Sequence, residues 1–170
     1  SALEAALEQG LATDVVVAES IAQSHALWHV REAIPLAQSE EGLNIKHDIS
    51  LPVSAMAAFV PRMAARLQAV TPGARVVCFG HLGDGNLHYN LQAPEGVPAA
   101  AFLTEHEARI NELVYDEVQR LGGSISAEHG IGELKRDELA RRGSPVALEL
   151  MRAIKNALDP DGIMNPGRLI

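Results

Sequence analysis

The strongest fold signal lies at residues 75–92, which read RVVCFGHLGDGNLHYNLQ. Two runs of mainly apolar and β-branched residues, 75–80 and 87–92, flank a glycine-rich segment. This pattern is typical of two antiparallel strands joined by a short turn. Taking residues 83–86 as a four-residue turn, we predict a hairpin in which Leu82 is opposite Leu87 and His81 is opposite His88.

This register would place two imidazoles on one face of the hairpin. Directly opposed residues on antiparallel strands have Cβ atoms about 4.5–5.5 Å apart. At that separation His81 and His88 can bind one divalent cation, and Asn90 projects to the same face. The alternative interpretation is that both histidines are ordinary strand residues that make hydrogen bonds. A metal site also requires a third ligand.

Residues 124–132, SISAEHGIG, supply the candidate for that ligand. A short strand at 124–127 is expected to end here, and a charged helix at 131–142 to begin. Glu128 would complete a set of two histidines and one carboxylate, which suits Zn²⁺ or Mn²⁺ and leaves positions open for substrate. Alternatively, its charge simply favours a helix N-terminus.

His129 lies beside Glu128 at the same expected helix start. The positive end of the helix dipole would keep its imidazole neutral and able to accept a proton. His129 is therefore the candidate general base, although a lone histidine is more often structural.

The rest of the chain mixes helices with strands. Residues 44–53 alternate, with Lys46 and Asp48 on the face opposite Ile45 and His47, which predicts a half-buried strand. Apolar periodicity predicts helices at residues 1–12, 21–34, 54–70, 98–121 and 145–158. Pro35 is expected to end the second helix, with residues 36–43 as a loop, and Pro61 to kink or break the third. The predicted class is α+β, with helices packed on a mainly antiparallel sheet.

Composition restricts the function. With 170 residues, 47% hydrophobic and 21% charged, the chain suits one soluble globular domain. A formal charge of -8 with scattered basic residues argues against a nucleic-acid partner, because phosphate binding requires clustered Lys and Arg. No apolar stretch approaches the ~20 residues of a transmembrane helix.

The N-terminus has no signal-peptide pattern, and Cys78 is the single cysteine, so a cytoplasmic location is expected. The sequence contains no glycine-rich cradle of the Rossmann or P-loop kind. The phosphates of any nucleotide cofactor must therefore be held elsewhere.

Three motifs together resemble a known family. They are GHLGDGNLHYN at 80–90, SAEHGIGELKRDEL at 126–139 and LDPDGIMNPGRLI at 158–170. They are similar to the C-terminal region of FAD-linked 2-hydroxyacid dehydrogenases and oxidases in the vanillyl-alcohol-oxidase flavoprotein superfamily. This group includes D-lactate dehydrogenases, D-2-hydroxyglutarate dehydrogenases and the flavin subunit of glycolate oxidase. Weaker matches are LWHVREAI at 27–34 and NIKHDISLPVS at 44–54.

The resemblance implies roles for individual residues. His81, His88 and Glu128 match the ligands of a divalent metal, zinc or manganese, and His129 matches the residue that takes the substrate hydroxyl proton. The remaining matches are to residues that hold the substrate carboxylate (Arg31 and Lys46), to a polar neighbour of metal and substrate (Asn90), and to a segment near the flavin (Asn165, Gly167 and Arg168).

The resemblance also implies a domain organisation and an activity. Residues 1–170 would be the C-terminal part of a ferredoxin-like cap, or substrate, domain, without the start of that domain and without the FAD-binding domain. The whole enzyme would oxidise a small D-2-hydroxy acid to the 2-oxo acid. The isolated chain would be inactive, and its uncovered apolar surface would favour self-association into a homo-oligomer.

Two rival functions are a stand-alone metal-dependent hydrolase and a non-catalytic subunit-contact module. The hydrolase predicts activity without flavin, and the module predicts no bound metal. Pro35 is a departure from the family, because members that act on larger diacids have a hydroxyl residue at that position. This departure argues against D-2-hydroxyglutarate as the substrate.

Overall fold

The computed structural model describes residues 1–170 and divides them into two units, Ser1–Gly42 and Leu43–Ile170. Every buried hydrophobic side chain belongs to the second unit. A single domain over residues 1–170 stays a prediction. None of the helices combines the length and apolar character that crossing a bilayer requires.

The first unit consists of three helices: α1 (Ala2–Glu8), α2 (Ile21–Glu32) and α3 (Ile34–Glu40). Ser20 caps α2 by accepting a hydrogen bond from the backbone N–H of Gln23. The predicted loop at 36–43 is wrong, because residues 36–40 are helical. Pro35 lies in the first turn of α3. The N–H groups of the first turn have no partner within the helix, so a proline is tolerated there. Pro35 therefore follows the end of α2 and also lies at the start of α3.

The second unit contains a sheet of three strands: β1 (Asp48–Ser50), β2 (Arg75–His81) and β3 (Asn86–Gln92). Their order is β1-β3-β2, and all pairs are antiparallel, which confirms the predicted α+β class. The predicted strand at 124–127 is reduced to one antiparallel bridge between Ser124 and Ser50 at the free edge of β1. Counting that bridge as a short fourth strand, the topology is the ferredoxin-like one.

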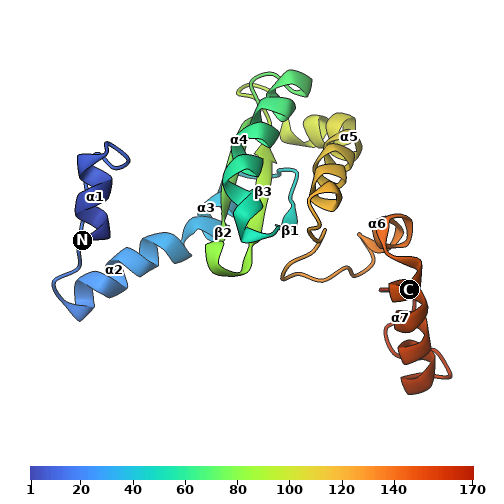
Figure 1. Cartoon of the computed structure of the whole chain (residues 1–170). Coiled ribbons are helices and arrows are strands. Elements are labelled where there is room, and N and C mark those ends of the chain that lie inside the picture. The colour runs from blue at the N-terminus through green and yellow to red at the C-terminus, as the bar shows by residue number, and fades with distance from the viewer. The chain divides into compact units, whose positions relative to one another are not determined.

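Two long helices, α4 (Val53–Val70) and α5 (Ala99–Arg120), supply most of the helical side of the core. α4 lies along the sheet (Figure 1), where the Phe59 and Tyr89 rings meet edge to face at 5.4 Å. The Tyr89 hydroxyl donates to the carbonyl of Val60 at 3.0 Å. α4 continues through Pro61 as one helix, so the predicted break there does not occur.

In β1 and β3 the residues with odd numbers point into this core, and in β2 the even-numbered Val76 and Cys78 do so. The odd-numbered residues include Ile49 in β1 and Leu87, Tyr89 and Leu91 in β3, all buried. Because side chains alternate along a strand, Asp48 and His88 project to the opposite face. The fold therefore keeps one face of the sheet apolar and leaves the other for polar chemistry.

The hairpin register differs from the predicted one by two residues. His81 pairs with Asn86, and His88 pairs with Phe79. The connection is a 3₁₀ turn, Leu82–Asp84, followed by Gly85 in the left-handed region, rather than a turn at 83–86. A two-residue shift preserves the face of each side chain, so His81 and His88 share a face but are diagonal neighbours instead of directly opposed.

Gly85 permits this turn, and replacing it should be costly. Its φ is +78°, and an added Cβ would lie 2.0 Å from the carbonyl oxygen of Leu51. We expect Gly85→Ala to lower the free energy of unfolding by at least about 2 kcal/mol, measured by denaturant titration. Gly83→Ala is the matched control, because nothing lies within 4 Å of its added Cβ. Equal stability of the two variants would contradict this account.

The C-terminal part adds α6 (Arg136–Arg142) and α7 (Pro145–Leu158). The helix predicted at 131–142 thus begins only at Arg136. Arg142 joins α6 to α5, since its guanidinium contacts Asp116 at 2.5 Å and Glu138 at 2.7 Å. The apolar stripe expected in α7 comprises Leu150, Met151, Ile154 and Leu158, and it is largely exposed, with only Met151 half-buried.

His47 should make stability depend on pH. Burial lowers its pKa from 6.5 to about 4, although a hydrogen bond between Nδ1 and the Tyr89 carbonyl opposes this. As pH falls through 6.5, the unfolded chain binds a proton that the folded chain does not, so stability is lost. The slope is about 1.4 kcal/mol per pH unit, and the total is about 3 kcal/mol by pH 4.

The measurement is denaturant unfolding at several pH values for the wild type and for His47→Gln. The difference between the two curves isolates His47 from the other titrating groups. We expect the variant to lack this part of the acid destabilisation. If the free energy of unfolding of both proteins changed equally between pH 4 and 6.5, burial would not lower the pKa of His47 in the folded state.

Candidate metal centre

The open face of the sheet gathers side chains from four segments. His81 ends β2, Asn86 and His88 belong to β3, and Asp48 begins β1. The fourth segment is residues 126–131, which follow the Ser124 bridge and contain Glu128 and His129. Asp48 is directly opposite His88 in the β1–β3 pair, so the strand register alone places these two together.

The predicted ligand set comes together around Glu128. Nδ1 of His81 lies 3.1 Å from Oε1 of Glu128, and Nε2 of His88 lies 3.4 Å from Oε2. Two ligand atoms on a tetrahedral zinc at its usual bond lengths are about 3.4 Å apart. Each histidine nitrogen is therefore at a suitable distance from the carboxylate, and the donor types suit a divalent cation such as Zn²⁺ or Mn²⁺.

Asn86 orients this carboxylate. Its Nδ2 donates to Oε1 of Glu128 at 2.6 Å and lies 3.2 Å from Nδ1 of His81. Asn86 is buried, and its Oδ1 has no hydrogen-bond partner. A buried amide oxygen without a partner is costly, so this atom offers an unused acceptor beside the ligands.

His88 is held between two rings. The Phe79 ring lies 4.9 Å away by centroid and the His129 ring 5.4 Å away, the latter nearly parallel. The His88 side chain is 14% exposed, against 58% for His81. His88 is thus the fixed histidine of the pair, and His81 is the accessible one.

Glu128 and His129 are not at a helix N-terminus, so the predicted dipole effect on His129 is wrong. They lie in an irregular segment that is held instead by Asp48. Oδ2 of Asp48 accepts the backbone N–H groups of Ala127 at 3.1 Å, Glu128 at 3.1 Å and His129 at 2.9 Å. Burial raises the pKa of Asp48, but these hydrogen bonds outweigh it, and the pKa ends below its usual value.

A second ligand set overlaps the predicted one. Asp48, His88, Glu128 and His129 each offer an atom, and these atoms lie within 4.8 Å of one another. Asp48 is the weaker candidate in this set, because its Oδ2 already receives three backbone N–H groups and the Ser126 hydroxyl. This leaves His88 and Glu128 as the shared ligands and His81 or His129 as the third.

Two of the predicted substrate-binding residues, Lys46 and Asn90, belong to the second unit and lie beside the pairing of β1 with β3. The register that joins Ile45 to Leu91 and Asp48 to His88 sets Lys46 opposite Asn90, on the open face. Lys46 is exposed, as a residue that binds an incoming carboxylate requires. Asn90 is buried, and its Oδ1 accepts the backbone N–H of His47 at 3.3 Å, so one of its functions is structural.

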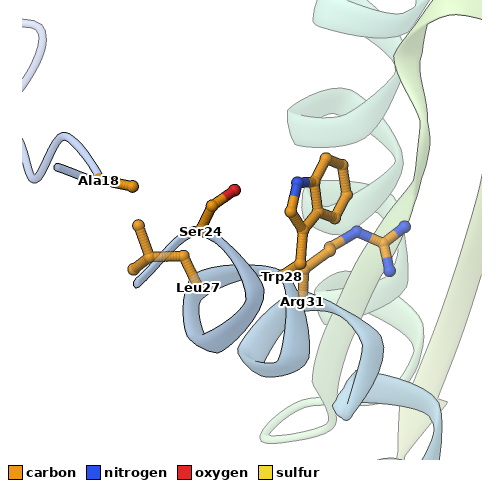
Figure 2. Close-up of a pocket in the computed structure, with 5 residues that line it drawn as sticks. All are labelled: Ala18, Ser24, Leu27, Trp28 and Arg31. Atoms are coloured by element: carbon orange, nitrogen blue, oxygen red, sulfur yellow. The ribbon is translucent and has the colours of Figure 1, made fainter. Parts of the chain in front are cut away.

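Arg31 belongs to the first unit, whereas the histidines of the site belong to the second. It projects from α2 near Trp28, with Leu27 one turn and Ser24 two turns before it (Figure 2). These residues and Ala18 line a shallow open depression. Trp28 is 60% exposed, so the depression combines a cation with uncovered aromatic surface. A role for Arg31 in binding carboxylate stays a prediction.

The predicted flavin-facing tail is attached to the segment around α6. Arg168 forms an ion pair with Glu133, and the carbonyl of Gly167 accepts from Nη1 of Arg136 at 3.1 Å. Asn165 has φ +46° and is the only non-glycine residue in the left-handed region. A flavin contact by Asn165, Gly167 or Arg168 stays a prediction.

Sequence reasoning did not single out Asp48 and Asn86. Alternation placed Asp48 on the correct face with Lys46, but it did not show that residues 126–129 would cover the carboxylate. Asn86 was assigned to the turn, although it is the first residue of β3. The pattern that could have identified them is the placing of an Asp and an Asn on the same sheet face as the two histidines.

The second unit thus presents histidines and a carboxylate on the open face of its sheet. Residues 1–169 match the family described as FAD linked oxidases, C-terminal domain. The chain belongs to this family.

Three relatives of the chain are named D-2-hydroxyglutarate dehydrogenases. The chain is 41% identical over 169 residues to the one from Xanthomonas citri pv. viticola, covering 99% of this chain and 35% of that protein. It is 41% identical to the mitochondrial one from Bos taurus, covering 99% of this chain and 29% of the relative. For the mitochondrial one from Arabidopsis thaliana, the identity is 40%, with 96% and 28% covered. The chain thus spans about a third of the length of these relatives.

Proposed function

We propose that this chain is the substrate- and metal-binding part of an FAD-dependent oxidoreductase that converts a small D-2-hydroxy acid into the 2-oxo acid. The observation that carries the proposal is the cluster of His81, His88 and Glu128 in a chain of the FAD-linked oxidase family. The flavin would be held mainly by another part of the intact protein, since this chain has no glycine-rich phosphate cradle.

When bound, a divalent metal would lower the pKa of the substrate hydroxyl, and FAD would accept the hydride from the substrate carbon. The ligands His81, His88 and Glu128 would fix where the hydroxyl sits. Asn86 would keep Glu128 in place through its 2.6 Å hydrogen bond. Such supporting contacts usually change metal affinity or activity by about 10- to 100-fold.

His129 would take the hydroxyl proton. Its Nδ1 lies 3.9 Å from Oδ2 of Asp48, beyond hydrogen-bond distance but close enough for charge attraction. The Asp48 carboxylate would then stabilise the positive charge on the ring, as a carboxylate behind a histidine does in other catalytic sites. The His129 side chain is 65% exposed, which leaves it accessible to substrate.

Lys46 and Arg31 would bind the substrate carboxylate. Lys46 is on the open face with His88, and an ammonium there attracts an anionic substrate. Arg31 would form two parallel hydrogen bonds with a carboxylate. Arg31 lies in the first unit, so its contribution is tested separately from that of Lys46.

D-2-hydroxyglutarate is the first substrate to test, because relatives with 41% identity carry that name. Pro35 argued against this diacid, but this departure concerns a single position. The identity over nearly the whole chain therefore has more weight than that one position.

The test uses the purified intact protein with its flavin. Under anaerobic conditions, we expect D-2-hydroxyglutarate to bleach the visible absorbance of the flavin, while the L-enantiomer does not. D-lactate is the comparison that measures selectivity for the second carboxylate. A flavin that no D-2-hydroxy acid reduces would refute the proposal.

A further inference from the structure

Asp48 is the most heavily hydrogen-bonded side chain of the site. Besides the three consecutive backbone N–H groups of residues 127–129, it accepts the Ser126 hydroxyl at 3.1 Å. Its side chain is 3% exposed. Residues 126–131 have no helical or strand hydrogen bonds of their own, so the carboxylate replaces the partners that regular structure would supply.

Lys135, which follows this segment in the chain, contacts both the residue before the segment and β1. Its Nζ donates to the carbonyl of Ile125 at 2.9 Å and to that of Asp48 at 3.4 Å. It also lies 4.0 Å from Oδ2 of Asp48, which partly balances the buried negative charge. Burial lowers the pKa of Lys135, and the attraction of Asp48 opposes this shift.

Residue 48 thus holds this segment at two places, through its carboxylate at residues 126–129 and through its carbonyl at the Lys135 side chain. Within the segment, Gly130 and Gly132 both adopt positive φ. Glu128 and His129 are both exposed, so burial does little to orient them. Asn86 holds the Glu128 carboxylate, and Asp48 holds the backbone from which both side chains project.

We infer that Asp48, assisted by Lys135, is a positioning residue that aims Glu128 at the metal and His129 at the substrate. It acts through backbone hydrogen bonds and not as a ligand. This inference rests on the proposed function, but its structural part concerns the segment alone. An amide at position 48 is a poorer replacement for the carboxylate. With its oxygen in the place of Oδ2, its NH₂ group would face the Glu128 N–H, which also donates to Oδ1 at 3.2 Å, and the negative charge would be lost.

The test compares Asp48→Asn with the wild type in the intact protein. The first readout is amide hydrogen exchange of residues 126–131, which in the wild type should be slow for an irregular segment. We expect Asp48→Asn to exchange there at least about tenfold faster, while β3 keeps its protection. The second readout is metal affinity, which should fall by about 10- to 100-fold.

Met63→Ala is the control for a general loss of stability, since Met63 is buried in α4 within the hydrophobic core. It should lower the melting temperature without changing metal affinity or exchange in 126–131. Lys135→Met serves if Asp48→Asn does not fold, because it removes the charge and keeps the apolar stem. It should accelerate exchange in the same residues.

Wild-type protection and metal affinity in Asp48→Asn would overturn the inference, as would equal losses in Met63→Ala. If the wild type binds no metal and its flavin is not reduced, the proposed function fails. In that case the exchange of residues 126–131 still decides whether Asp48 fixes the segment. Unchanged exchange in Lys135→Met would likewise count against the inference.

Discussion

Replacing His81 with alanine is expected to remove the bound metal from the intact protein and to lower turnover by roughly a thousandfold. His81 contacts Glu128 at 3.1 Å, and the predicted set holds no spare histidine that could substitute for it. Metal assistance to an ionising hydroxyl contributes several kcal/mol, and each 1.4 kcal/mol corresponds to about a factor of ten in rate. Metal content by elemental analysis and steady-state turnover are measured on the same preparation.

The matched control is His106→Ala, which removes an imidazole from α5 beside Phe102 and Glu105. It should keep metal and activity. Because His129 belongs to the overlapping ligand set, metal analysis of a His129 variant decides between the two sets. Metal retained without His81 but lost without His129 would assign the third ligand to His129.

Replacing His129 with asparagine is expected to lower kcat by about 10²- to 10⁴-fold while metal content is unchanged. The reason is that the amide of the new side chain could still donate a hydrogen bond but could not accept the hydroxyl proton. The measurements are kcat at saturating substrate and metal content on the same preparation.

This result separates a base from a ligand or a structural residue. Loss of a structural histidine would lower stability and leave kcat of the folded enzyme nearly unchanged. An unchanged kcat in His129→Asn would mean that another group takes the proton. Lys46→Met is the companion variant, which should raise KM more than it lowers kcat, because Lys46 is expected to bind the substrate without touching the proton.

The sequence was sufficient to predict the hairpin, the two long helices and the face shared by His81 and His88. Alternation and the glycine-rich turn determine these features locally. The register was wrong by two residues, because the turn type depends on Gly85 fitting against the carbonyl of Leu51, a contact that lies outside the hairpin. The predicted face of each histidine was nevertheless correct, because every second side chain of a strand points to the same face.

The helix start and the role of Asp48 could not be predicted in the same way. Charged residues at 133–142 favour a helix. The segment before them instead donates backbone hydrogen bonds to Asp48, about eighty positions earlier in the chain. A long-range hydrogen-bond network of this kind has no local pattern. Pro35 was similarly ambiguous, because a proline can end one helix and begin the next.

The most direct test of the metal-assisted oxidation is flavin reduction in the intact protein before and after removal of its metal. The protein is dialysed against a chelator, mixed anaerobically with D-2-hydroxyglutarate, and then reloaded with zinc or manganese. We expect flavin bleaching to be slow without metal and to recover on reloading, with no recovery in Glu128→Gln. Flavin reduction at the same rate with and without metal would contradict the account.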